Sequence, residues 1–403
     1  MKTLTTALFL SVAIFLSTNL HSQVTIGSSE PPAAGAILDL KQVGTTTKGL
    51  GLPRVKLVKR FNSDISTTID GVAAGAYPGD HTGLLVYHVS GEANERCAAI
   101  PSGLYVWDGS KWQPVGGEPL GPIESYTDQD GNEFYARQFG DAGTWMIQNL
   151  AAKHYARPDG TADTDNPLLV PDPSVSNDEN IREPRYSYPN VDENGTIYPI
   201  QYDRAPSTWT IAQGLLYNWA AATNRRGGNT DGFDYLNESQ GSTDEYNAAN
   251  VQGICPKGWH LPTDREWNVL EKELTENATS YAEDVANSAW NTYWEQDAGN
   301  WRGQHGKVIK SPCIVKGSPN ATPTGGKSLS LGQGGFEVLL VGIIDQDSPS
   351  EYGTNAFLSS ASGDSAAGSC YREVTNNSWL SDGVARAGYY YRRALMSVRC
   401  KKD

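Results

Sequence analysis

Short apolar runs alternate with turn residues early in the chain, which predicts a β-rich module over residues 23–117. Residues 50–58 (LGLPRVKLV) and 83–88 (GLLVYH) carry apolar side chains at alternating or consecutive positions. Such runs, bounded by Gly and Pro, are typical of short strands. Asp108-Gly109 lies between two aromatic segments and predicts the turn of a hairpin.

Residues 118–125 (EPLGPIES) lack aromatic side chains and predict a linker to a second domain over residues 126–403. In that domain, residues 126–150 place a polar Asp-Gly turn between alternating segments, which predicts a hairpin. FEVLLVGII, residues 336–344, predicts a buried strand. The last segment, 369–403, predicts two or three more strands.

Helix signals in the second domain are local and specific. In CPKGWHLPTDREWNVLEKEL, Thr263 and Glu266 form a capping box, in which each satisfies a backbone N–H at the start of a helix. Apolar residues then recur at helical spacing, so one helix is expected after a stiff Pro/Gly turn. His260 in this turn is expected to be structural.

A second helix is predicted over TWTIAQGLLYNWAAATN, residues 208–224. Ile211, Leu215, Trp219 and Ala222 fall on one helical face.

Composition and charge restrict the function. Residues 1–22 combine Lys2 with a short apolar run and a polar end, which predicts a secretory signal peptide. The net charge of -14, without a dense basic run, argues against nucleic-acid binding. Asp128 and Asp130 lie in a segment that resembles a calcium loop, but the Gly spacing favours a plain turn. No cofactor is expected, and structural calcium in the loops stays an open alternative.

Four segments of the first module stand out, ILDL (37–40), KGLGLPR (48–54), GLLVY (83–87) and LYVWDG (104–109). They resemble the N-terminal modules of exported Bacteroidetes proteins and of tail-fibre-like proteins. This resemblance implies a stalk, attachment or assembly module that associates with fimbrial or fibre subunits or forms homo-oligomers.

Seven segments occur in order over residues 124–403: DQDGNEF, TWMIQNL, GLLYNWAAATN, CPKGWHLPTDREWNVLE, FEVLLVG, YGTNAFLSS and SVRCKKD. They resemble the Fibrobacter succinogenes major paralogous domain. Leu358 departs from this pattern, which usually has a Trp there. GWHLPTDREW also resembles the formylglycine-generating enzymes, and SVRC the last strand of C-type lectin domains. These resemblances imply a C-type-lectin-like α+β fold with a Cys255–Cys400 bridge. Cys313–Cys370 is the remaining pair, with Cys97 free.

Two functions from different classes follow, with a purely structural surface or fibre component as a third. The first is a non-catalytic, adhesin-like protein at the cell surface that binds a glycan or a host or bacterial surface protein. The second is an enzyme of the formylglycine-generating type, which needs paired cysteines; Cys370 and Cys400 are the candidates. The first is preferred because no Ser-His-Asp, zinc or nucleotide motif occurs.

Ligand contact is predicted from aromatic and Arg side chains near the end of the chain, which give large contact area at low entropic cost. Strand alternation also predicts that part of this set faces the core. The set comprises Tyr371, Arg372, Trp379, Asp382, Arg386, Tyr389, Tyr390, Tyr391, Arg392 and Arg393.

Overall fold

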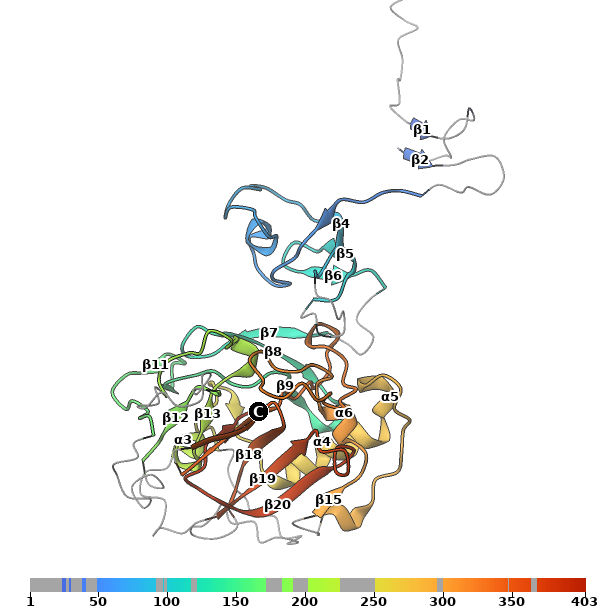
Figure 1. The fold of residues 1–403 in the computed structure, drawn as a ribbon. Coiled ribbons are helices and arrows are strands. Elements are labelled where there is room, and N and C mark those ends of the chain that lie inside the picture. Colours follow the sequence, from blue (N-terminus) through green and yellow to red (C-terminus); the bar gives the residue numbers. More distant parts are fainter. Residues whose placement is uncertain are drawn as a thin grey trace, which may run out of the picture. The chain divides into compact units, whose positions relative to one another are not determined.

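A computed structural model gives the fold (Figure 1). It divides the chain into two compact units, residues 1–53 and 54–403, which are described separately. The predicted signal peptide and residues 118–121 of the predicted linker lie outside the described residues. The structure describes 24–26, 29, 38–40, 49–91, 97, 100–116, 122–171, 183–190, 202–224, 251–295, 300–346, 348–363 and 368–403.

The first unit contains one pair of parallel strands among its described residues, β1 (Val24–Ile26) and β2 (Leu38–Leu40). The second unit begins with a four-stranded sheet in the order β3-β4-β5-β6. Its strands are β3 (Arg54–Val55), β4 (Leu85–His88), β5 (Gly103–Trp107) and β6 (Trp112–Pro114). A mostly β N-terminal region is therefore confirmed.

The hairpin predicted at Asp108-Gly109 joins β5 to β6. The Asp108 carboxylate accepts hydrogen bonds from the backbone N–H groups of Ser110 and Lys111, both at 2.8 Å. Gly109 has φ +103°, a conformation that other residues rarely adopt. One face of the sheet forms the core of this region, which consists of Leu57, Ile65, Val86, Tyr105, Trp107 and Trp112.

Two larger sheets build the rest of the second unit. The five-stranded sheet has the order β14-β22-β9-β8-β7. Its strands are β7 (Glu124–Thr127), β8 (Glu133–Gln138), β9 (Thr144–Met146), β14 (Trp259–His260) and β22 (Lys401–Lys402). The hairpin predicted over residues 126–150 is therefore confirmed and extended by a third strand. At its first turn, the Asp128 carboxylate accepts backbone N–H groups of Asp130 and Asn132.

The nine-stranded sheet follows the path β12-β13-β21-β18-β19-β20-β15, with β16 and β17 off this path. Figure 1 shows β18, β19 and β20 side by side. The strands are β12 (Tyr186–Ser187), β13 (Leu216–Tyr217), β15 (Asn300–Arg302), β16 (Val341–Asp345), β17 (Ser348–Tyr352), β18 (Asn355–Gly363), β19 (Gly368–Thr375), β20 (Val384–Tyr391) and β21 (Met396–Ser397). A separate pair joins β10 (Tyr155–Ala156) to β11 (Ala162–Asp163).

Helices are few and short among the described residues, apart from α4 (Asp264–Glu276). The predicted capping box is present, since Thr263 accepts the N–H of Glu266 and Glu266 accepts the N–H of Thr263. Trp267 is fully buried against β18 and donates to the backbone oxygen of Ser359 at 3.2 Å. The shorter helices are η1 (Ile65–Thr68), η3 (Gly140–Ala142), η4 (Ile211–Gln213), α3 (Trp219–Thr223), α5 (Ala278–Tyr281), η6 (Thr292–Glu295), α6 (Gly306–Ile309) and η7 (Leu331–Gln333).

The prediction of one helix over residues 208–224 is wrong. Gly214 interrupts it with φ +64°, and a Cβ there would lie 2.5 Å from the backbone oxygen of Leu150. The chain instead forms η4, the short strand β13 and then α3. Close backbone approach and strand pairing therefore override the helical spacing of the apolar side chains.

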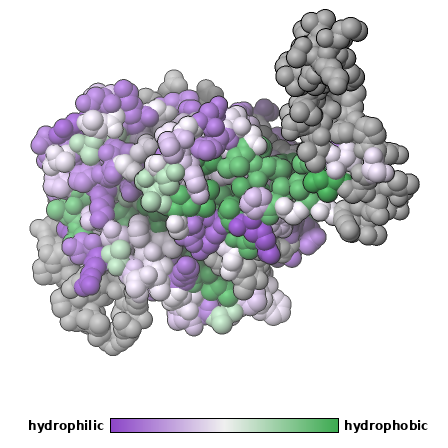
Figure 2. Space-filling view, turned by 90° about the horizontal axis from the view of Figure 1, so that it is seen from above, coloured by the Kyte–Doolittle hydropathy of each residue, from purple (hydrophilic) through white to green (hydrophobic). Residues whose placement is uncertain are grey.

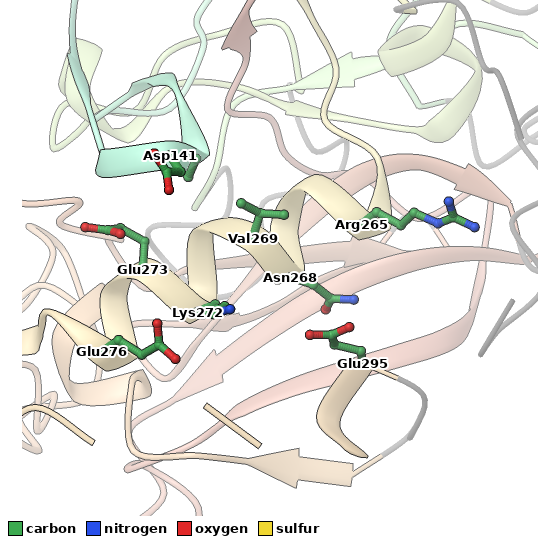
Figure 3. Close-up of a pocket in the computed structure, with 9 residues that line it drawn as sticks. Asp141, Arg265, Asn268, Val269, Lys272, Glu273, Glu276 and Glu295 are labelled. Carbon is green, nitrogen blue, oxygen red and sulfur yellow. The ribbon is translucent and has the colours of Figure 1, made fainter. Parts of the chain in front are cut away.

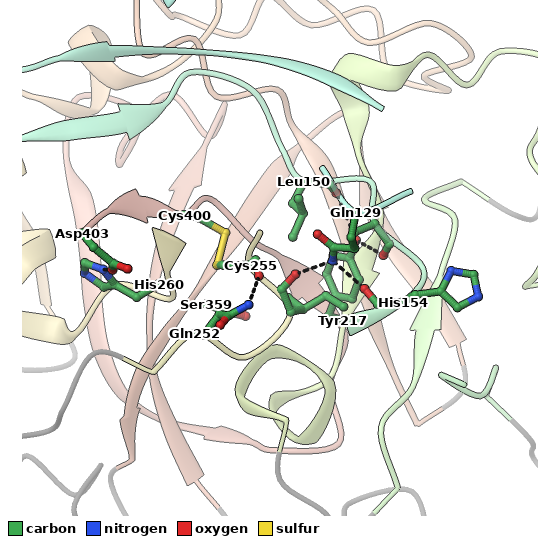
Figure 4. The surroundings of a disulfide bond; sticks show 12 residues. Gln129, Leu150, His154, Tyr217, Gln252, Cys255, His260, Ser359, Cys400 and Asp403 are labelled. Carbon is green, nitrogen blue, oxygen red and sulfur yellow. Dashed lines mark hydrogen bonds and ion pairs between the residues drawn. A yellow bond between two sulfur atoms is a disulfide. The ribbon is translucent and has the colours of Figure 1, made fainter. Parts of the chain in front are cut away.

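The Cys255–Cys400 bridge is present, with Cα atoms 5.9 Å apart (Figure 4). His260 lies beside it and contacts Asp403 at 2.6 Å and Glu266 at 3.0 Å. Burial opposes the charge of His260, but the hydrogen bonds to Glu266 and Asp403 raise its pKa. These contacts give His260 the structural setting that the sequence predicts.

The predicted Cys313–Cys370 pair and the free Cys97 are wrong. Cys313 pairs with Cys97, across a sequence separation of 216 residues, and Cys370 is a buried thiol on β19. This second bridge ties the β3–β6 region to the larger domain, which a pairing confined to the C-terminal cysteines cannot do. The C-type-lectin-like arrangement itself stays a prediction, because it is a resemblance and the strands and helices alone do not decide it.

Candidate functional site

Two of the predicted ligand residues, Arg372 and Arg386, lie inside the molecule beneath α4. Arg372 contacts Asp264 at 2.6 Å and also pairs with Glu271, and Arg386 contacts Asp264 at 3.0 Å. Arg302 adds a contact to Glu271 at 2.7 Å. Each of these guanidinium groups is paired with a buried carboxylate, so Arg372 and Arg386 belong to the interior of the fold and not to the candidate site.

The ion pairs explain why carboxylates can be buried here. Burial opposes ionisation of Asp264, but the charges of Arg372 and Arg386 hold its pKa down to about 2. Burial likewise opposes ionisation of Glu271, and Arg302 and Arg372 hold its pKa well below the usual value. Buried charges are tolerated when each one is paired and hydrogen-bonded, so this cluster fixes α4 to the sheet.

Trp379 has the opposite environment. It lies in the loop between β19 and β20, and 91% of it is exposed. An indole exposed in this way on a loop fixed by hydrogen bonds is accessible to another molecule. The loop is held by a compact turn in which Leu380 and Ser381 donate backbone N–H groups to the oxygen of Asn377.

Two lysines hold the same loop. The Nζ atom of Lys310 is fully buried and donates to the backbone oxygens of Thr375 and Ser381. Burial lowers the pKa of Lys310 to about 8. Lys307 pairs with Asp382, another predicted ligand residue, at 2.7 Å. The loop is thus anchored at both ends, and Trp379 projects from between the anchors.

A groove of about 710 Å³ lies beside Trp379. We call it the Trp379 groove. Its wall and floor come from β15, β17, β18 and β19, so strands far apart in sequence contribute to one hollow. Its lining includes Trp301, Glu351, Asn355, Glu373, Asn376 and Trp379.

Hydrogen bonds between the side chains of β18 and β19 link the polar residues at the floor of the Trp379 groove. Asn355 donates to the carboxylate of Glu373 at 2.7 Å and accepts from the hydroxyl of Thr375 at 2.8 Å. Burial, and then the charge of Glu351, raise the pKa of Glu373 to about 7, against the lowering effect of the Asn355 hydrogen bond. Burial also raises the pKa of Glu351. The groove therefore offers carboxyl and amide groups next to an indole face.

The tyrosines of the predicted set lie elsewhere on the sheet. Tyr371 is buried and packs edge-on against Tyr390, with ring centroids 5.4 Å apart. Tyr391 is 39% exposed, and the Arg393 guanidinium lies 3.9 Å from its ring centre. The side chain of Tyr389 lies outside the described residues.

Arg392 and Arg393 are engaged within the fold. Arg392 is buried, with its guanidinium 4.0 Å from the ring centre of Trp219 and a hydrogen bond to the backbone of Gly368. Arg393 contacts Asp345 at 3.1 Å. Among the members of the predicted set whose side chains the structure describes, only Trp379 lines the groove, and Asp382 lies at the base of its loop. Glu351, Asn355 and Glu373 were missed, although alternation along residues 371–375 does place Tyr371, Glu373 and Thr375 on one face.

A second hollow, of about 460 Å³, follows the outer face of α4 (Figure 3). In Figure 3, Asp141 points toward α4 from η3, and Glu295 approaches from η6. Two of its four acidic groups are engaged within the fold: Glu273 accepts the hydroxyl of Tyr281, and Glu295 accepts the indole N–H of Trp290, both at 2.7 Å. This face is therefore a mixed-charge helix surface, and the Trp379 groove is the better candidate site.

Two protein families match the chain, one in its C-terminal part and one in its N-terminal part. Residues 141–402 match the Fibrobacter succinogenes major domain. The chain belongs to this family. The Fibrobacter succinogenes major domain thus contains the Trp379 groove, the buried ion pairs and the Cys255–Cys400 bridge. Residues 25–131 match a phage tail-like trimerisation region. Comparison with curated proteins and with solved structures gave no match.

Together, the Fibrobacter succinogenes major domain and the tail-like region indicate a surface or fibre-like structural protein that self-associates through its N-terminal part. The disulfides, with these families, indicate export. No helix in the described part of the chain is long and apolar enough to cross a membrane. Within the same described ranges, no group of three or more His, Cys, Asp or Glu side chains is placed to hold a metal ion.

Proposed function

We propose that this protein is a non-catalytic, adhesin-like surface protein that binds a neutral glycan in the Trp379 groove. The observation that carries the proposal is the projection of Trp379, nearly fully exposed, from a loop anchored by Lys310 and Lys307. An indole face held in this way can stack on the apolar face of a sugar ring without a large entropic cost on binding.

The chemistry of the floor supports a sugar rather than an apolar ligand. Asn355 presents an amide, which both donates and accepts, and Glu373 presents a carboxyl group that titrates near neutral pH. Sugar hydroxyls need such mixed partners. The volume of about 710 Å³ falls within the range of roughly 300–1,000 Å³ that is usual for small-ligand sites.

Charge favours a neutral glycan over an acidic one. The groove is lined by Glu351 and Glu373 and by no Lys or Arg side chain among the described residues. When these carboxyl groups are ionised they repel a sialylated or sulfated sugar, and no cation in this lining attracts one. The side chains of Asn355 and Glu373 would bind the sugar hydroxyls directly, without a bridging calcium ion.

The test uses the protein without its predicted signal peptide, residues 23–403, on an array of neutral and acidic glycans. We expect binding to neutral glycans, with Trp379→Ala and Asn355→Ala each weakening affinity about tenfold or more. Tyr293→Ala is the matched control, since Tyr293 is 75% exposed but does not line the groove. It should bind like the wild type.

The outcomes separate the alternatives. Binding only to acidic glycans, or equal loss in the Tyr293 control, would contradict the proposal. An absence of any glycan binding by the wild type would favour a purely structural surface or fibre component. The formylglycine-generating alternative depends on a thiol pair, but Cys400 is bonded to Cys255 and Cys370 is buried on β19, which speaks for the non-catalytic reading.

A further inference from the structure

An apolar pocket of about 770 Å³ lies within the second unit and shares no lining residue with the Trp379 groove. We call it the aliphatic pocket. Most of its wall lies between residues 132 and 339, with contributions from β8, from η4 and from the segments 313–316 and 337–339. Branched aliphatic side chains from separate parts of the chain meet around it. They are Ile147, Ile211, Ile314, Val315, Leu331 and Leu339.

Some of these side chains are open to solvent. Ile211 is 38% and Ile314 is 44% exposed, although burial of such a side chain is favourable. Figure 2 views the domain from the side on which β7 and β8 lie in Figure 1, and apolar residues gather on its surface there. The strand β8 supplies Tyr135 to the pocket. An aliphatic molecule in the pocket would cover apolar surface that the chain itself leaves exposed.

Hydrogen bonds hold two walls of the pocket in place. The side-chain amide of Gln213, in η4, donates to the hydroxyl of Tyr352, which in turn donates to the backbone oxygen of Lys316. A capping box between Thr210 and Gln213 fixes η4 itself. The wall formed by η4 is therefore tied to the wall formed by residues 313–316. A ligand would enter a pocket that is already formed, which reduces the entropic cost of binding.

The polar groups of the lining suit an uncharged ligand. The hydroxyl of Tyr135 makes no hydrogen bond to any residue that the structure describes. The carboxyl group of Glu337 accepts the hydroxyl of Ser311 at 3.2 Å, and burial raises the pKa of Glu337 to about 7. The whole lining holds two Lys and two Glu side chains, so it favours neither sign of charge. Such surroundings disfavour a charged group and suit a hydroxyl or a carbonyl.

We propose that the aliphatic pocket binds a small, uncharged aliphatic molecule that carries one hydroxyl or carbonyl group. The branched side chains would surround the aliphatic part, and the hydroxyl of Tyr135 would donate to the oxygen of the polar group. The volume of about 770 Å³ lies within the range of roughly 300–1,000 Å³ that is usual for small ligands. A dissolved molecule is the fitting occupant, because the lining lacks the excess of basic residues that attracts a membrane surface.

The experiment measures the binding of hexanol, octanol and decanol to residues 23–403 by titration calorimetry. We expect one site, with an affinity that rises about two- to fourfold for each added CH₂ group. Decanoate and decylammonium have the chain length of decanol but a charged end, and each should bind about tenfold more weakly or worse. An affinity that does not depend on chain length, or equal binding of the charged molecules, would overturn the proposal.

Variants locate the site. Ala212 belongs to the lining and is only partly buried, so Ala212→Trp should fill the pocket and weaken decanol binding about tenfold or more. Val269→Trp is the matched control, because Val269 is 46% exposed on α4 and does not line this pocket. Tyr135→Phe removes only the hydroxyl and should weaken decanol binding about two- to tenfold.

Folding of each variant is checked by near-ultraviolet circular dichroism, and Ala212→Leu is the milder substitution if Ala212→Trp does not fold. Unchanged decanol binding in a folded Ala212 variant would overturn the proposal, as would an equal loss in the Val269 control. Wild-type affinity of Tyr135→Phe would overturn the place given to the polar group. Association with phosphatidylcholine vesicles without binding of dissolved decanol would also contradict the proposal, because the occupant would then be a membrane. None of these results depends on glycan binding at Trp379.

Discussion

The Nζ atom of Lys310 lies 3.0 Å from the backbone oxygen of Ser381 and also donates to the oxygen of Thr375. A fully buried ammonium group therefore holds together the two ends of the loop that presents Trp379. This contact couples the packing of α6 (Gly306–Ile309), which directly precedes Lys310, to the geometry of the Trp379 groove.

Lys310→Met should loosen this loop more than it destabilises the domain. The substitution leaves two buried carbonyls without their donor, which costs about 1–3 kcal/mol. We expect faster hydrogen exchange over residues 376–383 and weaker binding in the groove. Lys316→Met, at an exposed position, is the control. Unchanged exchange in this loop would show that Lys310 does not hold it.

Two carboxyl groups should make the protein less stable as the pH rises toward neutrality. Burial raises the pKa of Glu337 to about 7, and burial with the charge of Glu351 does the same for Glu373, from the ordinary value of 4.5. Between about pH 4.5 and 7 the folded state binds more protons than the unfolded state. The free energy of unfolding therefore falls as the pH rises through this window, and the loss is complete above it.

Glu337→Gln should remove most of this slope. We expect a gain of about 1–3 kcal/mol in the free energy of unfolding at about pH 8 and little change at about pH 4. Urea unfolding at both pH values measures it, and Glu373→Gln should act in the same direction but less, since Glu373 is only half-buried. Glu276→Gln, on the exposed face of α4, is the control. A slope that is unchanged in the Glu337 variant would contradict this assignment.

Arg372→Met should be among the most destabilising substitutions in the domain. It would leave Asp264 and Glu271 with fewer partners in a fully buried setting, at a cost of about 3–5 kcal/mol. Arg157→Met provides the comparison, because the Arg157 pair with Asp165 is exposed and is worth about 1 kcal/mol or less. Equal effects of the two substitutions on unfolding would refute the role given to the buried cluster.

The two bridges should have separable effects. Removing Cys255–Cys400 with paired Ala substitutions should lower the free energy of unfolding of the larger domain by about 4–5 kcal/mol on the chain-entropy model. Removing Cys97–Cys313, which closes the longer loop, should lower the free energy of unfolding by about 5 kcal/mol on the same model and should in addition increase proteolysis between the β3–β6 region and β7. Limited proteolysis together with denaturation distinguishes them, and identical behaviour of both variants would argue against this division.

Local signals in the sequence predicted local structure well. The Thr263–Glu266 capping box and the Asp108-Gly109 turn each depend on residues within a few positions of one another, and both are present. The helix over residues 208–224 failed because Gly214 meets the backbone of Leu150, a contact between distant segments. Spacing within one segment cannot reveal such a contact.

The candidate site shows the same limit. Trp379 stands out in the sequence as an aromatic residue in a polar turn, but its neighbours in the groove do not. Asn355 meets Glu373 only through the register of β18 with β19. The choice between Cys97 and Cys370 as the partner of Cys313 depends on how the β3–β6 region docks, which no residue spacing encodes.

The Cys97–Cys313 bridge also determines how the molecule would carry mechanical load. Tension between the N-terminal region and a ligand at Trp379 would pass along the backbone to Cys97, cross the sulfur–sulfur bond and continue from Cys313. Residues 98–312 lie outside this covalent load path. The strands β7, β8 and β9 and the helix α4 would therefore carry no force along their backbone while the disulfide is intact. With this bond in place, an external force on the protein would not begin to unfold the larger domain at its first strand.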